Sequence, residues 1–225
     1  MCIRYALAAA PAELMGEFGL DGCPGQFPSG YNLGPSQLLP IVCLGDDGRR
    51  VLRVLRWGLI PPRAGGTPEA TRINTRAETL PRKPRFFDTY RERRCIVPAS
   101  GYFEWVEDGP GHRPNYIQPA TGTLMGLAGI WKPAAHQEGD QADTFAILTV
   151  RANERLMPIH HRMPVVLEPD NYSAWLNPET PWAEVVRLSH SRATDRLLAY
   201  PVSLAVNQRE NNTPEVIRPL SSAVT

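Results

Sequence analysis

Short apolar runs recur along the chain, and turns rich in proline and glycine separate them. Apolar runs of this length, bounded by turn residues, are typical of β-strands. The 225 residues include 23 prolines and 18 glycines, which leave little room for long helices. We expect strands over residues 39–44, 51–57, 94–98, 101–106, 115–118, 125–131, 144–150, 165–167 and 200–206.

Turns and short helices connect these strands. Gly45-Asp46-Asp47-Gly48 predicts a hairpin turn, and 58–71 and 134–142 read as surface loops. Three of the expected helices begin with proline, which the first helical turn accepts. The expected helices cover residues 11–18, 85–91, 169–176 and 181–188. Because no internal repeat or linker divides the chain, we predict one β-rich α+β domain over residues 1–225.

Composition excludes several classes of protein. Hydrophobic residues make up 42% of the chain and charged residues 21%, which suits a packed core and not a disordered segment. No apolar run approaches the length that a bilayer requires, so we expect no membrane association and a cytoplasmic location. The four cysteines form neither a CxxC metal clip nor a dense disulfide framework, so we predict free thiols and no metal or cofactor.

Positive charge is unevenly distributed along the chain. The formal net charge is +1, yet residues 49–94 hold 13 Lys or Arg residues against four acids, a local charge of +9. Such a segment is typical of a protein that binds a phosphate-bearing partner. The alternative is a surface that simply uses arginine for solvation, since Lys83 and Lys132 are the only lysines among the 24 basic residues. Charge alone leaves both interpretations open.

Cys2 directly follows Met1. Removal of Met1 would place a free α-amine and a thiol on one residue, and such an aminothiol captures aldehydes by closing a five-membered thiazolidine ring. An α-amine titrates near ~8, so a useful fraction is neutral at pH 7. We expect the thiol to need only modest help to become a thiolate. Position alone is weak evidence, because a cysteine at residue 2 is more often incidental.

Four polar segments accompany Cys2. They are 31–35, 73–79 with Asn74, 98–105 with Glu104, and 158–164 with His160. Each has an ordinary structural explanation when taken singly: Asn74 could cap a turn, Glu104 could pair with an arginine, and His160 could be a structural histidine. The aromatic neighbours of Glu104 predict an apolar setting that raises its pKa.

Together these segments resemble the SRAP family, the SOS-response-associated peptidases, also described as abasic-site processing proteins. The resemblance covers essentially the whole chain, with two departures. Ile3 stands where the family usually has glycine, and 62–66 lacks the usual bulky residues. The matching motifs are Met1-Cys2-x-Arg4-Tyr5, Tyr31-Asn32-x-x-Pro35, Trp57-Gly58-Leu59-Ile60-Pro61, Asn74-x-Arg76-x-Glu78-Thr79, Arg94 to Pro98 with Gly101 to Trp105, Ile159-His160-x-Arg162-Met163-Pro164, and Pro201-Val202-Ser203-x-x-Val206-Asn207.

The resemblance implies curved antiparallel sheets, or an open barrel, flanked by short helices. It also implies a monomer that senses abasic sites in single-stranded DNA and crosslinks to them through Cys2. In this interpretation Asn74 orients the amine, Glu104 is the acid/base group and His160 assists ring opening. Crosslink reversal, a lyase-type activity and autocatalytic loss of Met1 are further implications. A general methionine aminopeptidase would explain the last equally well.

Phosphate contacts are expected from the arginines of the basic segment and its surroundings. The candidates are Arg4, Arg76, Arg85 and Arg162, and such contacts give salt-dependent binding with little sequence preference. Trp57 could stack on a base, although a tryptophan in an apolar run is more often part of the core. Two other functions stay open at this point: a cysteine peptidase acting in trans, and a non-catalytic reader of modified DNA.

Overall fold

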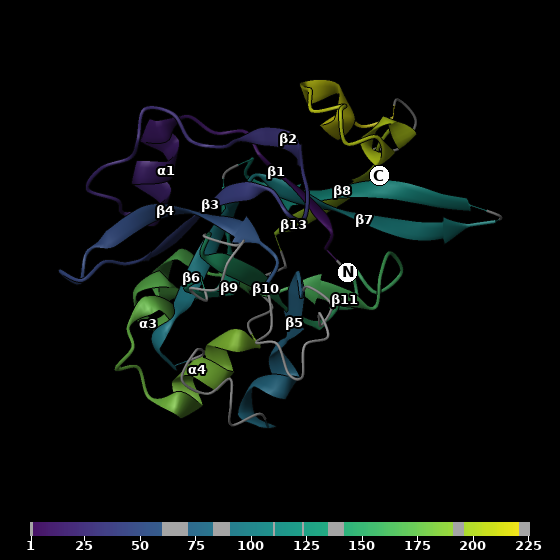
Figure 1. Cartoon of the computed structure of the whole chain (residues 1–225). Helices are drawn as coiled ribbons and strands as arrows, with labels where there is room; N and C mark the ends of the chain where they lie inside the picture. Colours follow the sequence, from purple (N-terminus) through teal and green to yellow (C-terminus); the bar gives the residue numbers. More distant parts are fainter. Residues whose placement is uncertain are drawn as a thin grey trace, which may run out of the picture.

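Two curved β-sheets form the body of the computed structural model (Figure 1). The structure describes residues 2–59, 72–82, 91–109, 111–122, 124–134, 142–190 and 196–220. The first sheet has the strand order β13-β8-β7-β1-β2. Its strands are β1 (Arg4–Leu7), β2 (Gly30–Leu33), β7 (Gly101–Asp108), β8 (Gly111–Pro119) and β13 (Leu197–Pro201).

The second sheet curls into a barrel. Its strand order is β11-β10-β4-β3-β6-β9-β12, and an additional pairing between β10 and β9 closes a ring. The α+β fold with curved sheets is therefore confirmed, and the barrel is closed. Its strands are β3 (Leu38–Leu44), β4 (Arg50–Trp57), β5 (Asn74–Arg76), β6 (Arg94–Ala99), β9 (Met125–Lys132), β10 (Thr144–Arg151), β11 (Arg162–Pro164) and β12 (Val166–Leu167).

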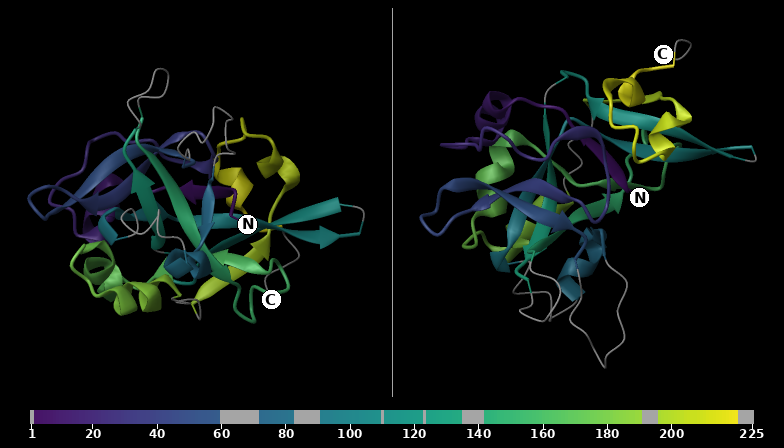
Figure 2. Two further views of the ribbon diagram at one scale, coloured as in Figure 1. Left: turned by 60° about the horizontal axis from the view of Figure 1, so that its bottom comes forward. Right: turned by 45° about the horizontal axis from the view of Figure 1, so that its top comes forward.

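Short helices lie at the rim of the sheets (Figure 2). As predicted, proline begins α1 and the turn that leads into α3, and Pro181 caps α4. The helix expected at 85–91 falls almost wholly outside the described residues. The helical elements are α1 (Pro11–Phe18), η1 (Ala77–Arg82), η2 (Pro169–Asn171), α3 (Tyr172–Leu176), α4 (Trp182–Ser189), η3 (Leu204–Asn207) and η4 (Pro214–Ile217).

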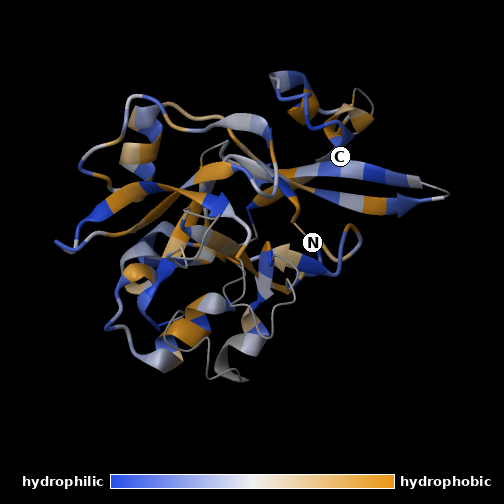
Figure 3. Ribbon diagram, in the orientation of Figure 1, coloured by the Kyte–Doolittle hydropathy of each residue, from blue (hydrophilic) through white to orange (hydrophobic). Residues whose placement is uncertain are grey.

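The alternation of side chains in β1 divides the interior into two cores. Tyr5 and Leu7 pack into the large core shared with the barrel, whereas Ala6 packs into a smaller core with Phe103. This follows from the twofold period of a strand, which sends successive side chains to opposite faces. Apolar residues follow the barrel strands in Figure 3, and the smaller core lies under the C-terminal segment.

The C-terminal segment, residues 203–218, contains η3 and η4 and is held by Asn32 of β2. The buried Asn32 amide donates from Nδ2 to three carbonyls of this segment, those of Val206, Gln208 and Asn211, at 2.9–3.1 Å. The expectation of extended chain through residue 206 holds through Ser203 and is wrong from Leu204 onward. The Ser203 hydroxyl accepts from the Ala205 N–H and begins a 3-10 turn there.

Candidate functional site

Cys2 lies just before β1, where the amino terminus emerges beside β5 and β11 (Figure 1). Its side chain is 0% exposed and belongs to the large core. The thiol donates to the Arg4 carbonyl over 3.7 Å, and the Cys2 carbonyl accepts a hydrogen bond of 2.8 Å from Nδ2 of Asn74. Asn74 is therefore directly bonded to the residue that sequence analysis singled out.

The position of Asn74 follows from how β5 pairs with the barrel. β5 runs parallel to β10, with Asn74 opposite Ile147. Oδ1 of Asn74 is buried and has no hydrogen-bond partner among the residues that the structure describes. The amide thus holds Cys2 through its nitrogen and presents a buried acceptor in the same place.

Glu104 reaches the site from β7. It follows Tyr102 on one face of the strand, and its residue is only 3% exposed, whereas Phe103 packs into the smaller core on the opposite face. Burial raises the pKa of the Glu104 carboxyl from 4.5 to about 7, and the charge and hydrogen bond of the chain's α-amino group oppose that rise. The predicted apolar setting is present, but Phe103 does not supply it.

Proximity of Glu104 also affects Cys2. Burial raises the pKa of the Cys2 thiol, and the negative charge of Glu104 raises it further. The thiol is therefore protonated near pH 7, and the expectation that it needs only modest help to ionise is wrong. A base must take the thiol proton at the moment of reaction.

His160 lies at the end of the connection that leads into β11. Its Nδ1 accepts the Arg162 N–H at 2.9 Å, and its ring stacks on His161 with centroids 4.4 Å apart. Burial lowers the pKa of His160, and the charge of the α-amino group lowers it further. Because this charge also acts on Cys2 and Glu104, the three side chains gather around the amino terminus.

The five residues predicted to contact DNA do not share one surface. Arg76 is exposed on β5. Arg4 points instead to the C-terminal segment, donating to Oδ1 of Asn32 at 2.9 Å and to the Val206 carbonyl at 3.4 Å. Arg85 lies outside the described residues.

Two of those predictions need correction. Trp57 is fully buried, packs edge-on against Tyr5 at 5.3 Å and donates to the Ile73 carbonyl, so it belongs to the core and cannot stack on a base there. The Arg162 side chain is 9% exposed and forms a bidentate ion pair with Glu78, so its charge is directed inward and away from a surface phosphate.

The sequence motifs contained two further residues whose role was not assigned. Asn32 fixes the C-terminal segment behind β1, and Glu78 holds Arg162. Both belong to motifs of the family pattern, yet a motif match does not say which partner a side chain takes. Ile3, the departure from that pattern, is 41% exposed and directly follows Cys2.

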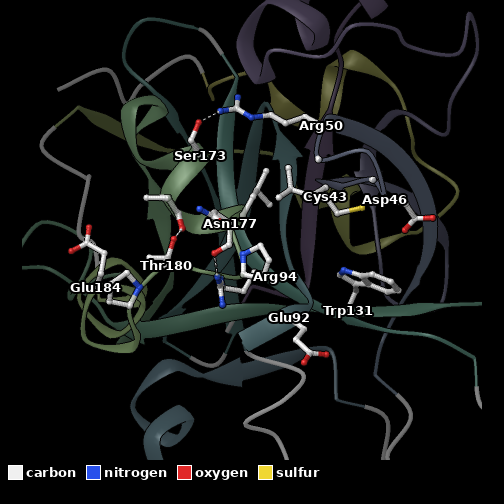
Figure 4. Close-up of a pocket in the computed structure, with 17 residues that line it drawn as sticks. Cys43, Asp46, Arg50, Glu92, Arg94, Trp131, Ser173, Asn177, Thr180 and Glu184 are labelled. Atoms are coloured by element: carbon white, nitrogen blue, oxygen red, sulfur yellow. Dashed lines mark hydrogen bonds between the residues drawn. The ribbon is translucent and has the colours of Figure 1, made fainter.

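A cavity of about 890 Å³ lies elsewhere, between the β3–β4 turn and helices α3 and α4 (Figure 4). Its lining includes Arg50, Arg94 and Trp131, and none of Cys2, Asn74, Glu104 or His160 belongs to it. Arg94 donates from Nη1 to the Arg91 carbonyl at 2.6 Å. It also donates from Nη2 to the carbonyl of Asn177, so it caps the C-terminal end of α3. This cavity is therefore separate from the candidate site around Cys2.

Among the described residues no three His, Cys, Asp or Glu side chains gather as a metal site would require. Within the same residues, none of the helices combines the length and apolar character needed to cross a membrane.

Known proteins of similar sequence cover nearly all of the chain. The abasic site processing protein YoqW of Bacillus subtilis is 36% identical over 223 residues, 96% of this chain and 99% of the relative. The abasic site processing protein YedK of Escherichia coli is 30% identical over 84% of both chains, and the abasic site processing protein HMCES of Gallus gallus is 30% identical over 89% of this chain and 69% of its own.

The fold has a close counterpart among crystal structures. A protein from Bacteroides thetaiotaomicron superposes with a TM-score of 0.83 at 26% identity, covering 97% of this chain and 100% of its own. The family model described as SOS response associated peptidase (SRAP) matches residues 1–209. With the motifs, the curved sheets and these matches in agreement, the chain belongs to the SRAP family.

Proposed function

We propose that this protein captures abasic sites in single-stranded DNA as a covalent adduct on Cys2. The observation that carries the proposal is the convergence of Asn74, Glu104 and His160 on the amino-terminal cysteine. An abasic deoxyribose opens to an aldehyde at C1′, the electrophile that an aminothiol captures. The relatives named abasic site processing proteins support this choice of substrate.

The reaction begins with loss of Met1, which frees the Cys2 amine. The amine adds to C1′ and the carbinolamine loses its hydroxyl as water, which gives an imine. Sγ then adds to C1′ while its proton leaves, and the imine nitrogen becomes the ring N–H of a thiazolidine. One water is lost in total, and no oxidant or metal takes part.

Glu104 is suited to both proton transfers. With a pKa of about 7, comparable fractions are acid and carboxylate at neutral pH. The acid protonates the departing hydroxyl, and the carboxylate accepts the thiol proton that Cys2 does not lose unaided. The same group returns the proton to sulfur when the ring opens, so reversal of the crosslink uses the same residues.

Asn74 and His160 position the reactants. Nδ2 of Asn74 fixes the Cys2 carbonyl, and the buried Oδ1, which has no partner among the described residues, would accept a hydrogen bond from the Cys2 amine once Met1 is removed. His160 has a lowered pKa because of burial, so it acts as a neutral donor from Nε2 to the ring oxygen of the sugar. Arg76 supplies a phosphate contact from the exposed face of β5.

Single-stranded DNA fits this site better than an intact duplex. C1′ is reached without breaking base pairs, and arginine contacts to the backbone give binding without sequence preference.

We expect the protein to act as a monomer. Met1 is removed either by the protein itself, with Glu104 as base, or by a methionine aminopeptidase.

The experiment compares three forms of the protein on a labelled strand with one abasic site, followed by a denaturing gel. The Met1-free chain should form a stable adduct, and a chain with an uncleavable N-terminal tag should form none. Cys2→Ala keeps the amine, so it should give no stable adduct but an imine that borohydride traps.

Two rival functions make different predictions in the same gel. A peptidase acting in trans needs only the thiol, so it would form no stable DNA adduct and would cleave peptides with or without the tag; a fully buried thiol of raised pKa does not favour it. A non-catalytic reader would form no adduct in any lane. A stable adduct with the tagged chain would refute the thiazolidine chemistry.

A further inference from the structure

An internal ion pair links the two sides of the candidate site. Arg162 of β11 donates from Nη1 to Oε1 of Glu78 at 2.7 Å and from Nη2 to Oε2 at 2.9 Å. Nη2 also donates to the carbonyl and to Oγ1 of Thr149, at 2.6 and 3.1 Å. The pair with Glu78 is bidentate and the contacts to Thr149 are buried, so together they fix the orientation of the guanidinium.

The topology explains what this pair connects. β11 pairs with the end of β10, and β5 pairs with the adjoining part of β10. Thr149 of β10 takes part in both pairings, opposite Pro164 and opposite Arg76. Arg162 therefore spans from β11 across Thr149 to η1, the turn that directly follows β5 and its Asn74.

The backbone of Arg162 has a second role. Its N–H lies 2.9 Å from Nδ1 of His160 and donates to it when the imidazole proton is on Nε2. Its carbonyl lies 3.1 Å from the same Nδ1 and accepts from it when the proton is on Nδ1. The ring is thus bonded to the residue whose side chain Glu78 holds.

We propose that Arg162, held by Glu78, is a positioning residue that sets His160 and Asn74 relative to each other and keeps His160 in a single tautomer. This assignment goes beyond a phosphate contact, because the side chain ends on an acid and not on solvent. The positioning role requires Glu78, and the negative charge of this residue cannot attract DNA. The expected effect on the rate of adduct formation rests on the proposed function, whereas the expected effect on the His160 ring does not.

The kinetic test measures single-turnover adduct formation and strand affinity separately. Glu78→Gln keeps the shape of the side chain but loses the charge, and Arg162→Lys keeps the charge but loses the bidentate geometry. Each should slow adduct formation about tenfold or more with affinity within about twofold of wild type, since a small misplacement of reacting groups is costly. The double variant should be no slower than the slower single variant, because both changes break one contact.

The matched control is Glu184→Gln. Glu184 also accepts two hydrogen bonds from an arginine, Arg187, at 2.6 and 3.1 Å, but on the exposed surface of α4. It should leave rate and affinity unchanged. An unchanged rate in Glu78→Gln overturns the proposal, and so does a loss of affinity confined to Arg162→Lys, which would make Arg162 a phosphate contact.

An NMR measurement tests the positioning role of Arg162 even if the protein forms no adduct. Imidazole ¹⁵N resonances of His160, assigned by their absence in His160→Gln, should report a single tautomer in wild type and a mixture of tautomers in Glu78→Gln. Identical resonances in both would overturn the proposal. A wild-type protein that forms no adduct, but shows this tautomer change, would refute the proposed function and leave the positioning role standing.

Discussion

Replacement of Glu104 by glutamine should stabilise the folded protein above neutral pH. Burial raises the pKa of this carboxyl from 4.5 to about 7. A carboxyl whose folded-state pKa is raised binds its proton more tightly in the folded state than in the unfolded chain. Its contribution to stability is therefore fully present below about pH 4.5 and is lost as pH rises through about 7.

The size of this effect follows from the same pKa values. One pKa unit corresponds to about 1.4 kcal/mol, so a rise from 4.5 to about 7 corresponds to about 3 kcal/mol. The glutamine side chain does not ionise, so the variant lacks this pH dependence. The difference in free energy of unfolding, variant minus wild type, should therefore increase by about 3 kcal/mol between pH 4.5 and pH 8.

Urea unfolding followed by tryptophan fluorescence, at intervals from pH 4.5 to pH 8.5, measures the difference. Both proteins must have the same amino terminus, because the α-amine lowers the pKa of Glu104. Glu107→Gln, an exposed position on the same strand, is the control and should run parallel to wild type. A constant difference between wild type and Glu104→Gln over the whole range would show that the carboxyl is not desolvated in the folded state.

Three further perturbations test other parts of the structure. Asn32→Ala removes the two amide N–H groups that three carbonyls of the C-terminal segment share, and the Oδ1 that accepts from Arg4; at about 1 kcal/mol for each of these three groups it should cost about 3 kcal/mol in urea unfolding, and an unchanged midpoint would contradict the anchoring role. Trp57→Phe should lower the melting temperature and leave single-strand affinity unchanged, because Trp57 is fully buried; weaker binding by a stably folded variant would restore the stacking role. Iodoacetamide should label the partly exposed Cys23 well before Cys2 in the native protein and both at similar rates in urea, which mass spectrometry resolves; rapid native labelling of Cys2 would contradict its burial.

The local sequence pattern predicted many of the helices, strands and turns of the fold. Pro11 placed the first helix correctly, and Gly45 to Gly48 predicted the turn between β3 and β4, because both signals act within a few residues. The closure of the barrel was not predictable in this way. It depends on β9 pairing with both β6 and β10, a choice that the sequence of β9 alone does not specify.

The candidate site shows the same division between local and distant information. The residues around Cys2 were identified from motifs, but their protonation depends on burial by distant strands, so the raised pKa of the thiol was missed. Arg162 was interpreted as a DNA contact because a charge is visible in sequence and its partner, 84 positions away, is not. The contact of Arg4 with Val206 could not be foreseen for a similar reason, since the two residues are 202 positions apart.

The contact between Arg4 and residues 206–207 has a consequence for biosynthesis. β1 is synthesised before the segment that holds its arginine, and the two are 202 positions apart. Arg4 therefore has no partner in that segment until the C-terminal residues have been made and have folded back against β1. If Cys2 captures abasic sites as proposed, chains that end before residue 206 should form the adduct more slowly than the full-length chain.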